Sequence, residues 1–169
     1  MMRGKKQPAD IDMLLVFKQK VDKDLEYVLR KRLEVIDHRI TLISKIEGAI
    51  RSPDFDAREG ILFEGMSLIT GRYLADGYGF SSLGFFIYST KGMSNVQKTK
   101  FYYALNGRGS SIGVIRDIEG IRISDNVIAV PLSKIELAKD FFDHVKIEYR
   151  YLPVMIPKRM FRRDLLSSC

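Results

Sequence analysis

The residues best suited to chemistry in this sequence are cations and aromatic side chains near position 100. Lys98, Lys100, Tyr102 and Arg108 follow one another within a short stretch. Lysine and arginine neutralise phosphates, and an exposed aromatic ring stacks on an unpaired base. The side chains of a strand alternate, so Lys98, Lys100 and Tyr102 would share one face of a strand. The pattern predicts a surface that binds single-stranded nucleic acid, and its alternative is an ordinary polar sheet face.

That prediction depends on the secondary structure of residues 98–105, for which the signals conflict. The aromatic residues of this segment favour a strand. Ser94 as a helix N-cap and Gly107 as a helix stop favour a helix instead. We expect a strand on the strength of the aromatic residues. In a helix the three side chains would point in different directions, and the predicted binding face would be lost.

A second cationic cluster lies at the C-terminal end of the chain. Its members surround Phe161, and they are Lys158, Arg159, Arg162 and Arg163. This density of positive charge is typical of phosphate contacts, and Phe161 could stack on a base. We therefore expect the tail to contribute to nucleic-acid binding. The alternative is a solvated terminus.

Residues 107–113 form a glycine-rich segment, Gly-Arg-Gly-Ser-Ser-Ile-Gly, ahead of a predicted short helix over 111–119. Such a loop can hold a phosphate with its backbone N–H groups where it enters a helix. Arg108 could add a bidentate contact. A flexible loop is the alternative, and too few residues follow for a dinucleotide-binding fold.

Residues 69–77 resemble the LAGLIDADG motif of homing endonucleases, with matches at Gly71, Ala75, Asp76 and Gly77. The resemblance implies a dimeric metal-dependent nuclease in which Asp76 binds a divalent metal at a paired-helix interface. It covers roughly residues 61–145. Arg72 and Leu74 depart from the motif, which puts the paired helices in doubt. The alternative interpretation is that Asp76 and Gly77 form a turn that ends a helix.

One long helix is predicted to lead the chain. Apolar residues recur at steps of three or four from a plausible N-cap at Asp10 to about residue 50, and no Gly or Pro interrupts them before Gly48, which is helical spacing. A helix of about 40 residues needs a partner for its apolar stripe, either within the chain or in a second subunit. The stripe consists of Leu14, Phe17, Val21, Leu25, Val28, Leu29, Leu33, Ile36, Ile40, Ile43, Ile46 and Ile50.

The rest of the chain predicts a small sheet domain. A second helix over 56–76 would complete a helical hairpin over 10–77, after a basic arm over 1–9. Strands are expected over 83–90, 121–124, 127–131 and 146–156, with a turn at Asp125-Asn126 and a helix from Ser133 to Val145. The fold class is therefore α+β: a long N-terminal helix and helical hairpin, a mixed β-sheet domain with two or three short helices over 78–157, and a basic tail over 158–169.

Composition and charge indicate which classes of partner the protein favours. The net charge of +7 and the pI of about 9.5 favour acidic partners, with nucleic acid first. No apolar stretch approaches the ~20 residues that span a bilayer, and no signal-peptide cleavage site is visible. We expect a cytoplasmic protein that does not bind membranes.

Cysteine usage excludes two kinds of site. Cys169 is the lone cysteine, so an internal disulfide and a cysteine zinc site are excluded. No motif indicates a catalytic triad, a metal site or a cofactor. The expected function is a non-enzymatic nucleic-acid-binding or scaffolding protein that forms a homodimer through its long helix. The alternatives are the nuclease described above and a protein-interaction module whose charge is incidental.

Overall fold

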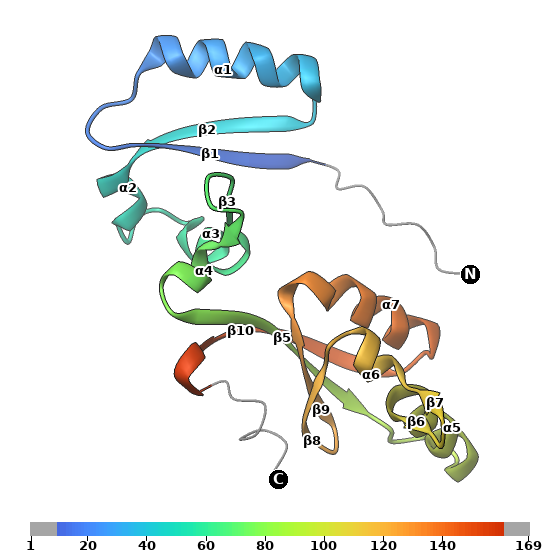
Figure 1. Ribbon diagram of the computed structural model, residues 1–169. Coiled ribbons are helices and arrows are strands. Elements are labelled where there is room, and N and C mark those ends of the chain that lie inside the picture. The colour runs from blue at the N-terminus through green and yellow to red at the C-terminus, as the bar shows by residue number, and fades with distance from the viewer. Residues whose placement is uncertain (1–9, 161–169) are drawn as a thin grey trace. The chain divides into compact units, whose positions relative to one another are not determined.

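The computed structural model describes residues 10–160, and it divides the chain between Arg58 and Glu59 into two compact units (Figure 1). Helices and small sheets alternate along both units. The predicted α+β class is therefore confirmed. Unit 1 ends at Arg58 and unit 2 begins at Glu59, and each is described by itself.

Unit 1 is a strand–helix–strand unit. Strand β1 (Ile11–Phe17) and strand β2 (Ile40–Ile46) pair in parallel, and helix α1 (Lys23–Ile36) connects them. The carboxylate of Asp22 caps α1 by accepting hydrogen bonds from the N–H groups of Asp24 and Leu25, both at 3.0 Å. Helix α2 (Glu47–Arg51) follows β2 directly.

The predicted long helix over residues 10–50 is wrong, because two strands flank a helix of 14 residues. Apolar residues are adjacent at Leu14 and Leu15 in β1 and at Leu42 and Ile43 in β2, so neither strand shows the regular apolar–polar alternation that identifies a strand in sequence. The isoleucines and leucines of β1 and β2 continue the three-to-four-residue spacing of α1. The whole segment therefore has the sequence pattern of one long helix. The predicted homodimer was to form through this long helix, so the structure gives no support for it.

The predicted second helix over 56–76 is also wrong, and the helical hairpin with it. Helix α3 (Arg58–Glu64) ends at Gly65, where a Cβ would collide with the carbonyl of Ile61. A short hairpin of β3 (Met66–Ser67) and β4 (Arg72–Tyr73) follows, and then a single turn, α4 (Leu74–Gly77). Gly65 follows the end of α3 and Gly71 lies in the turn between β3 and β4, so these two glycines mark breaks in the expected helix.

The centre of unit 2 is an antiparallel sheet of four strands in the order β10-β5-β9-β8. Helix α5 leads from β5 towards β8, and helix α7 leads from β9 to β10, which gives the split β-α-β arrangement. The elements are β5 (Phe80–Ser89), α5 (Asn95–Asn106), β8 (Ile121–Ser124), β9 (Val127–Pro131), α7 (Ile135–His144) and β10 (Glu148–Pro157).

Three short insertions complete unit 2. A two-stranded hairpin of β6 (Gly107–Arg108) and β7 (Ser111–Ile112) and the one-turn helix α6 (Val114–Asp117) lie between α5 and β8. The 3₁₀ turns η1 (Leu132–Lys134) and η2 (Lys158–Met160) precede α7 and follow β10.

The core of unit 2 lies between the sheet and the two helices α5 and α7. Phe86 of β5 stacks on Phe142 of α7 with ring centroids 5.3 Å apart. Tyr88 of the same strand meets Phe101 of α5 edge-on, also at 5.3 Å. Side chains at alternate positions of a strand share a face, so both helices cover the same face of the sheet.

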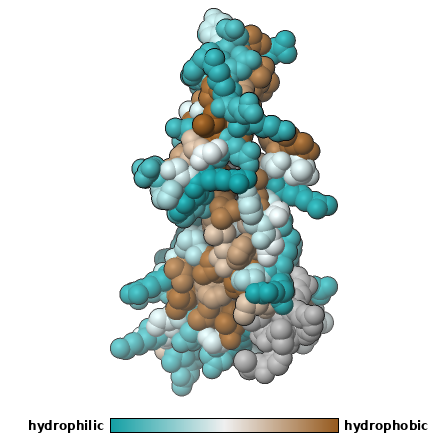
Figure 2. All heavy atoms as spheres, turned by 90° about the vertical axis from the view of Figure 1, so that its left-hand side faces the viewer, coloured by the Kyte–Doolittle hydropathy of each residue, from teal (hydrophilic) through white to brown (hydrophobic). Residues whose placement is uncertain are grey.

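The opposite face of the sheet also carries apolar side chains. Phe85 pairs with Leu152 and Ala129 in the neighbouring strands, and Ile87 follows it on the same face. Leu152 is 48% exposed and Ile87 is 40% exposed. Figure 2 shows hydrophobic side chains gathered on unit 2, in the lower half of the picture.

Several predicted elements of unit 2 are confirmed. The strands expected over 121–124 and 127–131 have those bounds, and β5 and β10 overlap their expected ranges. The strand expected over 98–105 is wrong, because that segment lies within α5. Among the helices of residues 10–160, none has the length and apolar character needed to cross a bilayer.

Candidate nucleic-acid interface

Helix α5 carries most of the candidate site, and its start is fixed by a capping box. The Ser94 hydroxyl accepts a hydrogen bond from the Gln97 N–H at 3.3 Å, and the Gln97 side-chain oxygen accepts one from the Ser94 N–H at 2.8 Å. Phe101 and Leu105, four residues apart, are buried against the core. These local signals override the strand preference of the aromatic residues.

The helix separates two of the lysines that a strand would have placed together. Residues two apart on a helix point in different directions, so Lys98 and Lys100 lie on different flanks of α5. Lys98 and Tyr102 are four apart and share the flank that faces β8. The predicted grouping of Lys98 with Lys100 on one face is therefore wrong, whereas Lys98 and Tyr102 do lie together.

The β8–β9 hairpin supplies the opposite wall of the site. Arg122 pairs in register with the fully buried Ile128, which directs it to the helix-covered face, and β8 is an edge strand. The Arg122 guanidinium donates to the carboxylate of Asp125 at 2.9 Å and to the carbonyl of Ser124 at 3.3 Å. The turn thus holds the cation at the sheet edge.

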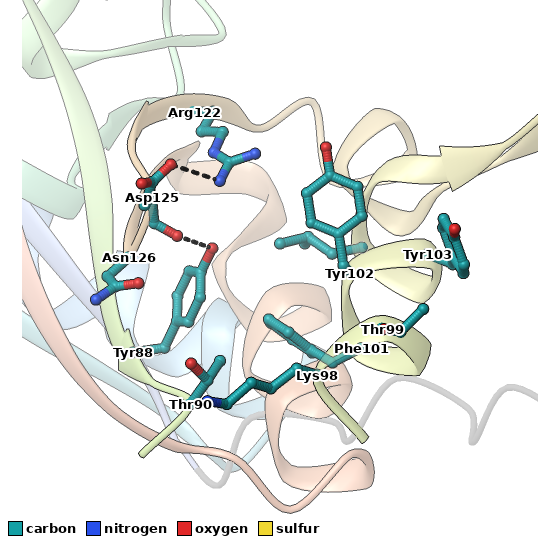
Figure 3. Close-up of a pocket in the computed structure, with 11 residues that line it drawn as sticks. Tyr88, Thr90, Lys98, Thr99, Phe101, Tyr102, Tyr103, Arg122, Asp125 and Asn126 are labelled. Carbon is teal, nitrogen blue, oxygen red and sulfur yellow. Dashed lines mark hydrogen bonds and ion pairs between the residues drawn. The ribbon is translucent and has the colours of Figure 1, made fainter. Parts of the chain in front are cut away.

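A cavity of about 370 Å³ lies between α5 and this hairpin. In Figure 3, Arg122 and Lys98 approach it from opposite sides, and the ring of Tyr102 lies across from Tyr88 and Asn126. Asp125 is the one acidic residue of the lining, and it is paired with Arg122. Its full lining is Tyr88, Thr90, Lys98, Thr99, Phe101, Tyr102, Tyr103, Leu105, Arg122, Asp125 and Asn126.

Two arginines lie over the two exposed tyrosines of α5. The guanidinium carbon of Arg122 is 5.7 Å from the centroid of the Tyr102 ring, and that of Arg108 is 4.8 Å from the centroid of the Tyr103 ring. Tyr102 is 48% exposed and Tyr103 is 37% exposed, so both rings retain surface for a ligand. The site therefore contains two pairs, each with a cationic side chain next to an exposed aromatic ring.

Tyr88 joins the cavity to the core. Its hydroxyl donates to the carbonyl of Asp125 at 2.8 Å, and its N–H donates to the carbonyl of Asn126 at 2.9 Å. Burial raises the pKa of the Tyr88 phenol above its ordinary value, against a smaller lowering by Arg122. The phenol is therefore neutral at physiological pH and fixes the hairpin turn against β5.

The glycine-rich segment forms a hairpin. Gly107 has a φ of +88°, and a Cβ on it would collide with the Ser111 carbonyl. A Cβ on Gly113 would collide with the backbone of Gly107, so these two glycines allow the two strands to close. The helix α6 that follows has only four residues, too short for the predicted phosphate site. Arg108 remains part of the candidate site, because its guanidinium lies over the ring of Tyr103.

Lys158 and Arg159, the two cations of the predicted tail cluster that the structure describes, follow β10 at the other end of β5 from the cavity. Pro157 pairs with Phe80, at the start of β5, whereas Tyr88 lies near its end. Ten residues of strand separate these ends by about 30 Å. Lys158 forms an ion pair with Asp76 at 2.8 Å, and Arg159 is exposed. Arg162 and Arg163 lie outside the described residues.

The features implied by the LAGLIDADG resemblance are not found at the matching residues. Asp76 lies in the four-residue turn α4 and is paired with Lys158. A strand, β5, follows it, and the sheet has the order described above. Within residues 10–160, no group of three or more His, Cys, Asp and Glu side chains is placed to hold a metal ion.

Most of the residues that line the cavity were not singled out from the sequence as site residues. The turn at Asp125-Asn126 is visible as a hairpin signal, but Arg122 and Tyr88 reach α5 only through the strand order of the sheet. Tyr103 follows Tyr102 directly in the sequence, and the close approach of Arg108 distinguishes it in the structure. Comparison with protein-family models, curated protein sequences and solved structures gives no match to this chain.

Proposed function

We propose that unit 2 binds single-stranded nucleic acid through the surface formed by α5, the β6–β7 hairpin and the β8–β9 hairpin. The observation that carries this proposal is the pairing of exposed tyrosines with arginines, Tyr102 with Arg122 and Tyr103 with Arg108. Aromatic rings stack on bases that are not paired, and neighbouring cations neutralise the phosphates between them.

The charge of the surface supports the same proposal. Lys98, Arg108 and Arg122 contribute three positive charges, and Asp125 contributes one negative charge. The chain as a whole carries +7, which attracts a polyanion from a distance. Lys100 lies on the other flank of α5 and is not part of the proposed surface.

The test is a titration of labelled single-stranded and double-stranded oligonucleotides with the full chain, followed by fluorescence anisotropy over a salt series. Neutralisation of about three phosphates on a single strand corresponds to a slope of about −2 in log K against log salt. Lys98→Ala and Arg108→Ala should each make this slope shallower by about 0.7, because each removes one phosphate contact.

Lys100→Ala serves as the matched control, since it removes a lysine from the same helix but from another flank. Single strands should bind more tightly than duplexes, because the stacking rings need unpaired bases. Binding that is indifferent to salt, or equal losses in all three variants, would contradict the proposal.

A further inference from the structure

The cavity between α5 and the β8–β9 hairpin has features that the extended surface around it lacks. It is walled by a half-exposed aromatic ring, it has a cation on each of two opposite sides, and it contains an amide side chain (Figure 3). Its volume of about 370 Å³ lies at the lower end of the range of small-molecule sites, which begins near 300 Å³. This size suits one nucleotide.

We infer that this cavity is a subsite for a single nucleotide, with the base stacked on Tyr102 and the phosphate held by Lys98 and Arg122. The inference rests on the proposed function and names what occupies the cavity: one unstacked nucleotide of a strand. A free nucleoside 5′-monophosphate has the same chemistry and serves as the probe.

The polar groups of the lining suit the parts of a nucleotide. Arg122 is a planar donor already oriented by Asp125 and Ser124, so it loses little freedom when it binds a phosphate. Lys98 adds a second, mobile cation from the opposite side. Asn126 presents an amide with both donors and an acceptor, which can pair with a base edge. Thr90 and Thr99 also line the cavity and add hydroxyl groups, of which that of Thr99 donates to the Asn95 carbonyl at 2.9 Å.

The position of Tyr102 favours stacking over a purely structural role. Its ring is 48% exposed, and Arg122 lies 5.7 Å from its centroid, which leaves ring surface open to the cavity. The neighbouring Phe101 is buried in the core and carries the packing of α5. Removal of the Tyr102 ring should therefore change binding while the fold persists.

The experiment is isothermal titration calorimetry of the full chain with a nucleoside 5′-monophosphate, the matching nucleoside and inorganic phosphate. The monophosphate should bind at least about tenfold more tightly than either the nucleoside or phosphate, because only it engages both the ring and the cations. Tyr102→Ala should weaken it about tenfold, whereas Tyr102→Phe, which keeps the ring, should stay within about twofold.

Two control variants separate the subsite from general effects. Lys98→Ala should weaken monophosphate binding severalfold, and Lys100→Ala should leave it unchanged. Tyr27→Ala removes an exposed tyrosine from unit 1 and should also leave it unchanged. Circular dichroism of each variant shows whether the helix content is kept.

The outcomes distinguish this inference from the proposed function. If the monophosphate binds no better than phosphate, while oligonucleotides still bind with salt dependence, the subsite is refuted and the broader surface stands. If neither the monophosphate nor an oligonucleotide binds, both fail. If the monophosphate binds but an oligonucleotide does not displace it, the cavity takes free nucleotides, and the proposed function is refuted.

Discussion

Tyr88 connects the candidate site to the stability of unit 2. Burial raises the pKa of its phenol, and burial likewise raises the pKa of Tyr149 and of Tyr151 in β10. The folded state thus holds these protons more tightly than the unfolded chain. The stability that they contribute is complete below about pH 10, the value of a free tyrosine, and is lost as the pH rises through the raised values.

We predict that the melting temperature of the protein falls as the pH is raised above about 10 and is insensitive to these phenols below it. Thermal unfolding followed by circular dichroism over alkaline pH would measure this. Tyr88→Phe should reduce the alkaline sensitivity, because the variant has no phenol to ionise at that position. It should also cost about 1 kcal/mol near neutral pH, because the hydrogen bond to the Asp125 carbonyl is lost. A flat profile above pH 10 would contradict the burial of these phenols.

At the scale of the element, α5 is the part on which the site depends most. Its capping box satisfies backbone N–H groups that have no partner within the helix. We predict that Ser94→Ala destabilises the protein by about 1 kcal/mol in denaturant unfolding, a typical loss for an N-cap.

Ser110→Ala provides the control for this prediction, because Ser110 is an exposed residue between β6 and β7. Ser94→Ala should also weaken oligonucleotide binding, since fraying of the first turn displaces Lys98. Equal stability of the two variants would show that the cap contributes nothing.

Particular elements show which parts of the fold the sequence predicts. The strands β8 and β9 are visible because β-branched residues flank a strong turn signal at Asp125-Asn126. In α5, the Ser94 and Gln97 pair and the spacing of Phe101 and Leu105 indicate a helix, but the aromatic residues between them favoured a strand. The strands β1 and β2 lack a regular apolar–polar alternation, and tertiary pairing alone distinguishes them from a helix.

The candidate site was predictable in part. Lys98, Tyr102 and Arg108 stand out by residue type, and the structure places all three around α5 and its adjoining hairpin. Arg122 comes from a strand whose place at the sheet edge depends on strand order, which local sequence does not encode. Conversely, Lys158 looked free in sequence, and the ion pair with Asp76 is a product of the fold.

At the scale of the whole molecule, the two units differ in how much they bury. Among the described residues, Leu42 is the one buried hydrophobic residue of unit 1, whereas unit 2 has a continuous core around Phe86 and Phe142. Burial of apolar surface is the main stabilising term in folding. Unit 1 should therefore open more readily than unit 2.

We predict that amides of β1, α1 and β2 exchange with deuterium faster than those of β5 and β9 by hydrogen-exchange mass spectrometry. A difference of about 2 kcal/mol in opening free energy corresponds to a rate difference of about thirtyfold. A ligand that occupies the site should slow exchange in α5 and the β8–β9 hairpin and leave the exchange of unit 1 unchanged. Equal protection of β1 and β5 would contradict the difference in burial.

The central claim is that single-stranded nucleic acid binds at α5 and its neighbouring hairpins. The most direct measurement is photo-crosslinking of the full chain to a 4-thiouridine oligonucleotide, with the crosslinked peptides identified by mass spectrometry. We predict crosslinks at Tyr102 and Tyr103 and in the β8–β9 hairpin, and their loss when Lys98, Arg108 and Arg122 are all changed to alanine. Crosslinks confined to residues 10–58 or to residues after 157, or crosslinks that persist in the triple variant, would contradict the claim.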